Sequence, residues 1–318
     1  MKTNAIVRII LFSVAILVLL GILIAGLGIG LFAADLRAYE GSVTTDERYV
    51  TPVDSGDNVF TQEGVLEFQA SEIRDLHIEW AAGSITIEPG DTDVIKVREY
   101  GSGNPFVCRQ SGDKLVIKFD DIEVYFGITI EHSKDLVITV PRDWVCGTLE
   151  MDVASANVDV SNLTIQNVEF DGASGVCTFA NCNVSEMDMD TASGDIRFSG
   201  SLNYLECDAA SADCVLVLSN VPRVIDMDGA SGDMDITLPE GSGFTVSMDG
   251  LSTDFTSEFD FVSRNGCYVC GDGSCRIEID AMSGDLTIRK GAATGQGHHF
   301  HDETCDTPDS TCPDKHHS

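Results

Sequence analysis

The sequence is poor in positive charge: 19 Lys and Arg stand against 52 Asp and Glu in 318 residues, a formal net charge of −33 at pH 7. Because phosphate backbones are bound by basic faces, this balance excludes nucleic acid as a partner. Histidine is scarce as well, and none occurs between His132 and His298. Its absence removes Ser-His and Cys-His catalysis from the middle of the chain, so the sequence predicts a protein that is not an enzyme.

Charged residues are missing altogether from one long segment near the N-terminus. Residues 9–34 form 26 consecutive uncharged positions, most of them Ile, Leu, Val, Ala or Gly. A membrane helix needs about 20 apolar residues, whereas the apolar region of a cleaved signal peptide has only about 7–15. The run therefore predicts a single transmembrane helix that is retained as a signal anchor. Lys2 and Arg8 precede it, which predicts that residues 1–8 are cytoplasmic and that the remaining chain lies outside the cell membrane.

Helical periodicity is also lacking, because no stretch after residue 35 sustains apolar residues at helical spacing. Residues 35–62 are polar and without a period, which is typical of a linker. Beyond them apolar and polar residues alternate in short runs that are separated by turn signals, the pattern of β-strands. The outer part is therefore predicted to be all-β. The clearest runs before residue 145 are 76–80, 85–87, 94–97, 115–119 and 136–140.

From residue 149 the chain repeats itself seven times around a serine, with spacings of 19, 19, 18, 20, 21 and 31 residues. An aspartate precedes every one of these serines by three positions. A period near 20 with β alternation is typical of a solenoid, in which each coil buries its apolar face only against its neighbours. The sequence thus predicts a parallel β-helix-like solenoid over residues 63–290. The serines are Ser155, Ser174, Ser193, Ser211, Ser231, Ser252 and Ser283, and the aspartates are Asp152, Asp171, Asp190, Asp208, Asp228, Asp249 and Asp280.

The phase of the alternation locates a corner in each coil. Apolar residues lie six and four positions before the serine and three and five positions after it, so one residue of phase is lost in between. Because a one-residue slip turns the side chains of a strand over, a bend at the serine is needed to keep the apolar residues inside. Each coil is then expected to hold two or three short strands. We expect the alanine before the serine, such as Ala192 or Ala230, to fill a tight inner corner, and residues 263–275, an insertion in the last spacing, to project as a loop.

The repeated unit Ala-Ser-Gly-Asp followed by alternating apolar residues, as in 192–198, 230–236 and 282–288, carries a resemblance. Together with the single N-terminal membrane segment and the hairpin-rich stretch 64–145, it resembles the bacterial putative-adhesin family of unknown function, whose members are membrane-anchored β-strand-repeat proteins. The resemblance implies a β-solenoid on the outside of the cell, with a role at the surface or in the envelope. It implies no catalytic residues.

Acidic side chains are predicted to line one outward face of the solenoid. Residues 149–290 contain 25 Asp and Glu but only 6 Lys and Arg. Two interpretations remain open. The aspartates accept backbone N–H groups in turns, or they bind Ca²⁺, which prefers carboxylate oxygens. No cofactor is required by either. The candidate metal ligands on this face are Asp190, Asp208, Asp228, Asp195, Asp213 and Asp233.

The 11 cysteines and the tail offer further candidate ligands. Cys177, Cys207 and Cys214 occupy apolar positions of the repeat and are predicted to be core thiols. Three more, Cys267, Cys270 and Cys275, lie close together, and we expect one local disulfide among them. The tail 291–318 has a composition typical of disorder and of weak binding to a transition metal such as Zn²⁺, Ni²⁺ or Cu²⁺. Its candidate ligands are His298, His299, His301, Cys305, Cys312, His316 and His317.

Three functions are compatible with these patterns. The first is a membrane-anchored, non-enzymatic, adhesin-like module that binds an extracytoplasmic protein or glycan. The second is an accessory protein of an envelope-stress signalling system, which acts through partners in the same membrane. The third is a carbohydrate-active β-helix enzyme that uses paired carboxylates. The 6 Lys and Arg of residues 149–290 cannot easily line a groove for acidic sugars, which counts against the third.

Overall fold

The computed structural model describes residues 65–101, 106–119, 122–125, 128–131, 133–264 and 266–291. These residues form strands and a single 3-10 turn, η1 (Ala70–Glu72). None of the helices in this described part is long and apolar enough to cross a membrane. The transmembrane helix predicted at residues 9–34, the linker 35–62 and residues 292–318 of the tail lie outside the described residues, so these predictions stay as they are.

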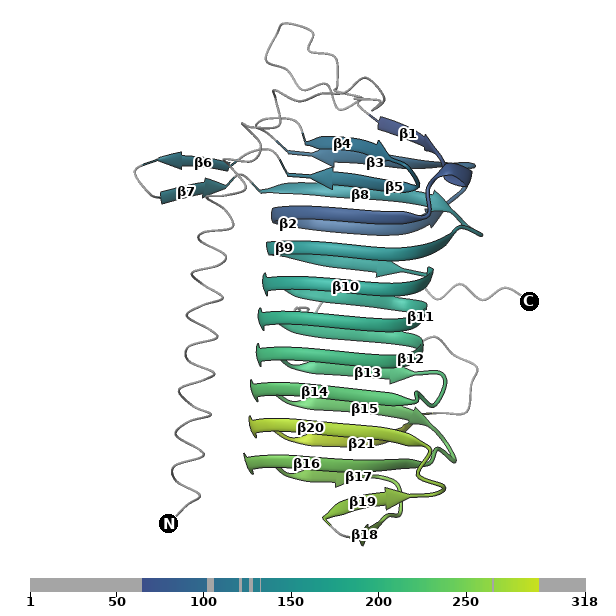
Figure 1. Ribbon diagram of the computed structural model, residues 1–318, viewed down its shortest axis with the longest axis vertical. Helices are drawn as coiled ribbons and strands as arrows, with labels where there is room; N and C mark the ends of the chain where they lie inside the picture. Colours follow the sequence, from purple (N-terminus) through teal and green to yellow (C-terminus); the bar gives the residue numbers. More distant parts are fainter. Residues whose placement is uncertain are drawn as a thin grey trace, which may run out of the picture.

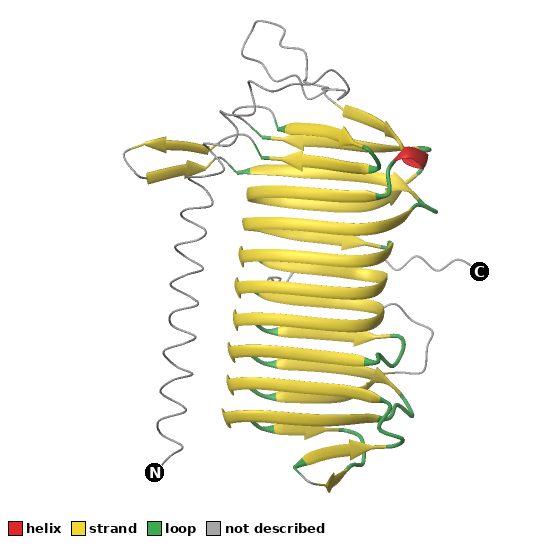
Figure 2. Cartoon of the chain, viewed as in Figure 1, coloured by secondary structure: helices red, strands yellow, loops and turns green. Residues whose placement is uncertain are grey.

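The molecule is a stack of flattened coils that is closed at one end by antiparallel strands (Figures 1 and 2). The prediction of an all-β solenoid is confirmed. The closing strands and the first coil are β1 (Val65–Gln69), β2 (Asp75–Gly90), β3 (Val94–Tyr100), β4 (Val107–Ser111), β5 (Lys114–Lys118) and β8 (Lys134–Pro141). Strands β6 (Ile122–Tyr125) and β7 (Ile128–Glu131) form a separate antiparallel pair. The remaining strands are β9 (Val145–Ser161), β10 (Thr164–Ser174), β11 (Val176–Ser193), β12 (Asp195–Ser211), β13 (Cys214–Leu218), β14 (Val224–Ser231), β15 (Met234–Pro239), β16 (Phe244–Ser252), β17 (Phe255–Ser257), β18 (Val262–Arg264), β19 (Cys267–Cys270), β20 (Cys275–Ser283) and β21 (Leu286–Gly291).

Each coil has two arms, a first arm that ends at the corner serine and a second arm that follows it. Arms of successive coils pair in parallel and in register, so that Met187 of β11 lies between Val168 of β10 and Leu205 of β12. The apolar residues predicted to point inward do so, and Met187, Ile196 and Phe198 are all at most 2% exposed. Burial of these side chains between the arms, at roughly 25 cal/mol per Å² of apolar surface, is the main force that holds the stack together.

The corner itself differs from the prediction in one respect. Ala192 is exposed and Ala230 is only half-buried, so the alanine before the serine does not fill the inner corner. The inner position is the residue after the serine, as Ala212 shows with 3% exposure. In most coils this residue is a glycine with positive φ, and a Cβ on Gly232 would lie 1.9 Å from the carbonyl oxygen of Ala212. The coils whose corner has positive φ therefore need glycine there, because the backbones of adjacent coils approach so closely.

The coils do not stack in the order of the sequence. The last repeat, β20 and β21, lies between the coil of β14 and β15 and the coil of β16 and β17 (Figure 1). Residues 263–275 do not simply project as a loop, because β19 within them pairs in antiparallel fashion with the outer edge of β16. This pairing provides hydrogen-bond partners for part of the backbone of β16 at the edge of the terminal coil, which an open loop would leave unpaired.

The first coil of the solenoid is β2, which the repeat pattern did not reveal. Its first arm pairs in parallel with β9, and Ala82 takes the place of the corner serine opposite Ser155. Above it β4 and β5 form a hairpin, as expected from the sequence of the lead-in, and β3 pairs in antiparallel fashion with β8 from further along the chain. Strand β5 continues the stack in parallel with β2, so that Lys118 lies opposite Glu79. The first coil is thereby placed between a repeat rich in acids and a strand rich in lysine.

Candidate functional site

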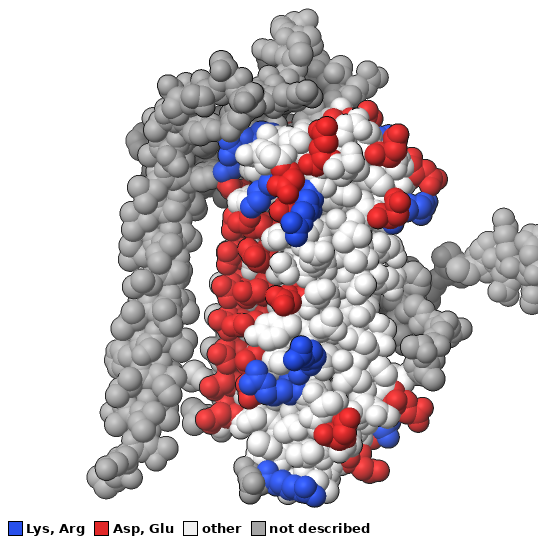
Figure 3. All heavy atoms as spheres, turned by 45° about the vertical axis from the view of Figure 1, so that its right-hand side comes forward, with Lys and Arg blue, Asp and Glu red and all other residues white. Residues whose placement is uncertain are grey.

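The in-register stack turns the acidic repeat positions into two straight columns on the first-arm face. We call them column A, three residues before the corner serine, and column B, five residues before it. Neighbouring strands lie about 4.8 Å apart, so each carboxylate has another directly above and below it. Figure 3 shows the acidic side chains as a stripe along the stack. In spatial order column A is Glu79, Asp152, Asp171, Asp190, Asp208, Asp228, Asp280 and Asp249, and column B is His77, Glu150, Glu169, Asp188, Glu206, Asp226, Glu278 and Ser247.

The described residues bring no cation into ion-pair distance of the middle of column A. Within the described residues, no ion pair forms with Asp190, Asp208 or Asp228. Partial burial, together with the carboxylates of neighbouring coils, raises the pKa of each of the three. For Asp208, which lies between Asp190 and Asp228, the pKa rises to about 6. This face therefore concentrates negative charge at an energetic cost to the fold, which a binding cation or basic group would relieve.

A third set of acids, column C, lies two residues after the corner and has a structural role. The backbone N–H of Asp233 donates to Oδ1 of Asp213 at 2.9 Å, and that of Asp285 donates to Oδ1 of Asp233 at 2.9 Å. Asp195, at the start of this column, instead forms an ion pair with Arg197 at 3.2 Å. Acceptance of backbone N–H groups, expected for the aspartates of column A, is thus found in column C, where the bent backbone leaves donors unpaired.

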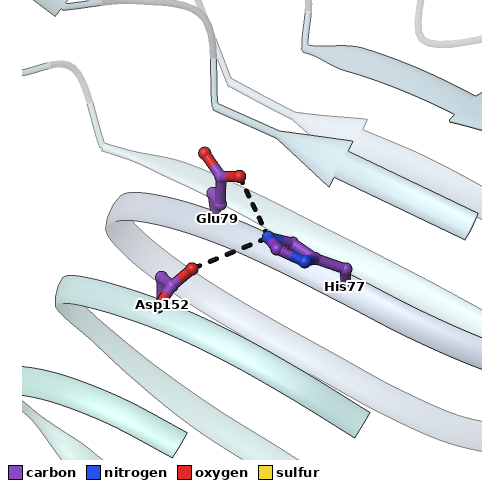
Figure 4. A group of neighbouring side chains, drawn as sticks. All are labelled: His77, Glu79 and Asp152. Atoms are coloured by element: carbon purple, nitrogen blue, oxygen red, sulfur yellow. Dashed lines mark hydrogen bonds and ion pairs between the residues drawn. The ribbon is translucent and has the colours of Figure 1, made fainter. Parts of the chain in front are cut away.

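One end of columns A and B holds a cluster around His77, the one histidine among the described residues. Its Nε2 lies 2.9 Å from Oε1 of Glu79 and 3.6 Å from Oδ2 of Asp152, and its Nδ1 lies 2.9 Å from Oε2 of Glu150. Figure 4 shows Glu79 and Asp152 converging on the same ring nitrogen from two different coils. Two lysines of β5 complete the cluster: Lys118 Nζ is 2.5 Å from Glu79, and Lys114 Nζ is 2.8 Å from Glu150.

The electrostatics of this cluster are the reverse of those in the middle of the stack. Burial raises the pKa of Glu79, but the hydrogen bonds from His77 and Lys118 outweigh it, and the pKa is held below its ordinary value. The same balance lowers the pKa of Glu150, where Lys114 and His77 oppose burial. The pKa of His77 is raised, first by the hydrogen bond to Glu79 and, against burial, by the charges of the surrounding carboxylates.

The predicted metal ligands are only partly brought together. Asp190, Asp208 and Asp228 are neighbours in column A, and Asp195, Asp213 and Asp233 are neighbours in column C on the other side of the corner. Within the described part of the chain, the one group of three ligand atoms within 4.8 Å of one another is formed by His77, Glu79 and Asp152. Whether Ca²⁺ binds the columns stays a prediction, and the tail candidates His298, His299, His301, Cys305, Cys312, His316 and His317 lie outside the described residues.

Sequence reasoning missed His77 and Glu79 because it placed the first repeat at residue 149. A signal was present: in residues 76–87 the spacing of apolar residues matches that of the later repeats, with Ala82 and Gly83 at the corner in place of serine and the residue after it. The absence of the corner serine concealed the copy, and with it the beginning of both columns.

The cysteines are thiols throughout the described residues. Cys177, Cys207 and Cys214 are at most 3% exposed, which confirms them as core positions. The disulfide expected among Cys267, Cys270 and Cys275 is not formed, so that prediction is wrong. The reason lies in the strands: Cys270 of β19 and Cys275 of β20 pair with Phe244 from opposite sides of β16, which keeps the two thiols a full strand apart.

Comparison with known proteins identifies a family. The family described as Toastrack DUF4097 matches residues 73–217 and again 148–289. Among curated proteins, none matches the chain.

Three solved structures are similar over most of their length. A putative cell adhesion protein from Clostridium sporogenes has 10% identity and a TM-score of 0.35, and the match covers 72% of this chain and 98% of that one. A putative adhesin from Bacteroides fragilis has 14% identity and a TM-score of 0.41, with 71% and 95% covered. A putative lipid binding protein from Parabacteroides distasonis has 14% identity and a TM-score of 0.31, with 72% and 96% covered.

Proposed function

This chain belongs to the Toastrack DUF4097 family, and we propose that it is a membrane-anchored, non-enzymatic, adhesin-like module whose columns A and B bind a basic extracytoplasmic protein. The observation that carries the proposal is the unneutralised middle of column A. Carboxylates that repel one another weaken the fold, and no structural contact within the described residues uses Asp190, Asp208 or Asp228. A partner that brings Lys and Arg to this face would relieve the repulsion, so binding and charge neutralisation would reinforce each other.

The shape of the molecule supports binding to a broad surface. The face is an in-register sheet with a fixed spacing between carboxylates, a rigid template that loses little conformational entropy on binding. A small cavity lined by residues that include Met227 and Leu286 has a volume of about 10 Å³, enough for about one water molecule. An anionic glycan would be repelled by the face, which is why we favour a basic protein.

Two further parts of the proposal depend on the sequence. The apolar run 9–34 supports a membrane anchor, and Lys2 and Arg8 before it support a solenoid outside the cell. For the absence of catalysis, support comes from the lack of histidine between His132 and His298. A reporter fused after Ser318 is expected to be active only outside the membrane, and activity in the cytoplasm would contradict the proposed location.

The function can be tested with cells that display the full chain and are washed over an array of basic and acidic extracytoplasmic proteins. We expect retention on basic proteins at low salt and its loss when salt is raised, because exposed charges are screened beyond about 8 Å at physiological ionic strength. The variant Asp190→Asn, Asp208→Asn, Asp228→Asn is expected to lose most of this retention.

The matched control removes the same number of charges elsewhere. Glu72, Glu240 and Asp260 are exposed and lie outside the three columns. The triple variant Glu72→Gln, Glu240→Gln, Asp260→Asn therefore has the same net charge as the column variant and is expected to be retained like the wild type. Equal loss in both variants would show that net charge alone matters, and no loss in either would exclude the face as the binding site.

A further inference from the structure

We propose that His77, Glu79 and Asp152 form a binding site for a divalent transition metal ion of the zinc class, at the end of columns A and B nearest the antiparallel strands. The proposal is separate from the binding of a basic partner, because it concerns one site between β2 and β9 rather than the length of the face. Imidazole nitrogen together with carboxylate oxygen is a ligand set that Zn²⁺ accepts readily.

The spacing of the three ligand atoms fits such an ion. In tetrahedral zinc sites with ligand distances of about 2.0–2.1 Å, the ligand atoms lie about 3.3 Å from one another. Nε2 of His77 lies 2.9 Å from Oε1 of Glu79 and 3.6 Å from Oδ2 of Asp152, so the two distances bracket that value. All three atoms lie within 4.8 Å of one another. Three protein ligands would leave one position for water.

The histidine is already held in the orientation that a metal ligand needs. Oε2 of Glu150 lies 2.9 Å from Nδ1 of His77 and can accept the Nδ1 proton, while Nε2 faces Glu79 and Asp152. In the metal-free chain Nε2 hydrogen-bonds to Glu79, so an ion that binds there takes the place of the Nε2 proton. A carboxylate on the second ring nitrogen is the usual support of a zinc-bound histidine, because it fixes the ring and makes the other nitrogen more basic. Glu150 is itself held by Lys114 at 2.8 Å. Glu150 is thus a positioning residue.

Lys118 is the competitor for this site. Its Nζ lies against the same oxygen of Glu79 that faces His77. Glu79 has a second carboxylate oxygen, and the flexible lysine stem allows the ammonium group to shift to it while Oε1 turns to the metal. The neighbouring Asp171, which lies opposite Asp152 on the next coil, adds negative charge that favours a bound cation. We therefore expect Lys118 to weaken the site without closing it.

The site joins two coils that are far apart in sequence, since Glu79 and Asp152 come from β2 and β9. A metal that binds only the folded chain stabilises it, by about 2.7 kcal/mol at a hundredfold excess over Kd. Binding in the tail would not have this effect on the solenoid. The melting temperature therefore distinguishes the two places of binding.

The test uses the full chain, purified in detergent, in a background in which the tail cannot bind metal: His298→Ala, His299→Ala, His301→Ala, His316→Ala, His317→Ala, Cys305→Ser and Cys312→Ser. Zn²⁺ is titrated in competition with a chromophoric chelator, and the melting temperature is recorded with and without Zn²⁺. We expect one Zn²⁺ per chain and a rise in melting temperature. His77→Ala and Asp152→Asn are each expected to weaken binding at least about tenfold, and Lys118→Met to strengthen it.

The matched control is Asp171→Asn, which removes one charge from the adjacent position of column A without removing a ligand. It is expected to change the affinity less than about threefold, an effect of charge alone. The proposal is overturned if the full chain with the substituted tail binds no Zn²⁺, or if Asp171→Asn weakens Zn²⁺ binding as much as Asp152→Asn does. Should His77→Ala fail to fold, Asp152→Asn decides, because its side chain is 48% exposed and its loss leaves the core intact.

Discussion

The first coil and the middle coils carry acids at the same positions of the same columns, yet their surroundings are opposite. Where β2 meets β9, Glu79 and Glu150 contact His77 and two lysines of β5, and the pKa of each glutamate is lowered. At β11, β12 and β14 the column A carboxylates form no ion pair within the described residues, and their pKa values are raised by burial and by neighbouring carboxylates, that of Asp208 to about 6. The register of the backbone places the acids. At the first coil His77 and the two lysines of β5 neutralise them, and further along Arg276 pairs with Glu278 of column B at 3.0 Å, whereas the described residues bring no ion pair to the middle of column A.

This difference distinguishes the groups that stabilise the fold from the groups that the fold leaves available for binding. Apolar burial between the arms and the glycine corner fix the stack whether or not the outward acids are neutralised. We therefore expect the carboxylates in the middle of column A to lower the stability of the fold. Acids kept at such a cost are expected to serve an interaction, whereas the acids around His77 are neutralised by groups of the fold itself.

The largest expected effect comes from disturbing the register on which both regions depend. Gly232 has a φ of 139°, and a Cβ there would lie 1.9 Å from a backbone oxygen of the neighbouring coil. We expect Gly232→Ala to lower the free energy of unfolding by about 3 kcal/mol or more, measured by denaturant titration. Gly241→Ala is the control, since Gly241 also has positive φ, 85°, but nothing within 4 Å of the added Cβ. It is expected to cost about 1 kcal/mol, from φ alone. Equal losses would exclude the close approach as the cause.

A smaller loss of stability is expected when a cation is removed from the cluster around His77, so that its carboxylates resemble those in the middle of column A. Lys118→Met removes the cation from the half-buried Glu79 and is expected to lower the free energy of unfolding by about 1 kcal/mol. Lys96→Met breaks the exposed pair with Glu67, whose atoms are 3.7 Å apart. That control is expected to cost less than about 0.5 kcal/mol. If both variants lose the same stability, the first coil is not specifically neutralised by Lys118.

The pH dependence of the melting temperature is expected to depend on both the middle of column A and the cluster around His77. The pKa of Asp208 is about 6 in the folded chain against 3.8 ordinarily. The folded state thus holds the proton more tightly, and this contribution to stability is lost as pH rises from about 4 to 6. Glu79 and Glu150 have lowered pKa values in the folded chain, so they stabilise it at pH values above their ordinary pKa. This stabilisation is lost as the pH falls through their pKa values in the folded chain. We expect a higher melting temperature at pH 5 than at pH 7, by about 2–4 °C.

The control for this profile is the variant Asp190→Asn, Asp208→Asn, Asp228→Asn. It keeps His77, whose raised pKa also favours the folded state at lower pH, and it removes the middle of column A. Its melting temperature is expected to fall less between pH 5 and pH 7 than that of the wild type. An unchanged slope would show that these three aspartates do not cause the pH dependence.

Much of this fold is predictable from the sequence, because the solenoid, its corner and its inward residues follow from local periodicity. The order of the coils is not, since β20 lies between β14 and β16 through pairings that the repeat pattern leaves equally favourable in other orders. The same limit affects the site. Columns A and B follow from the position of each acid relative to the corner serine, but Lys118 reaches Glu79 only through the pairing of β5 with β2, a contact that no local pattern indicates.

The central claim is that the middle of column A costs stability and is not structural. It is tested most directly by the melting temperature, at pH 7 and low salt, of the full chain that carries Asp190→Asn, Asp208→Asn and Asp228→Asn. Because these side chains are exposed and partly screened, we predict a modest rise of about 2–5 °C above the wild type. The variant Glu72→Gln, Glu240→Gln, Asp260→Asn, with the same net charge, is predicted to shift by less than about 1 °C. A melting temperature of the column variant below that of the wild type would contradict the claim and make the three aspartates part of what holds the coils together.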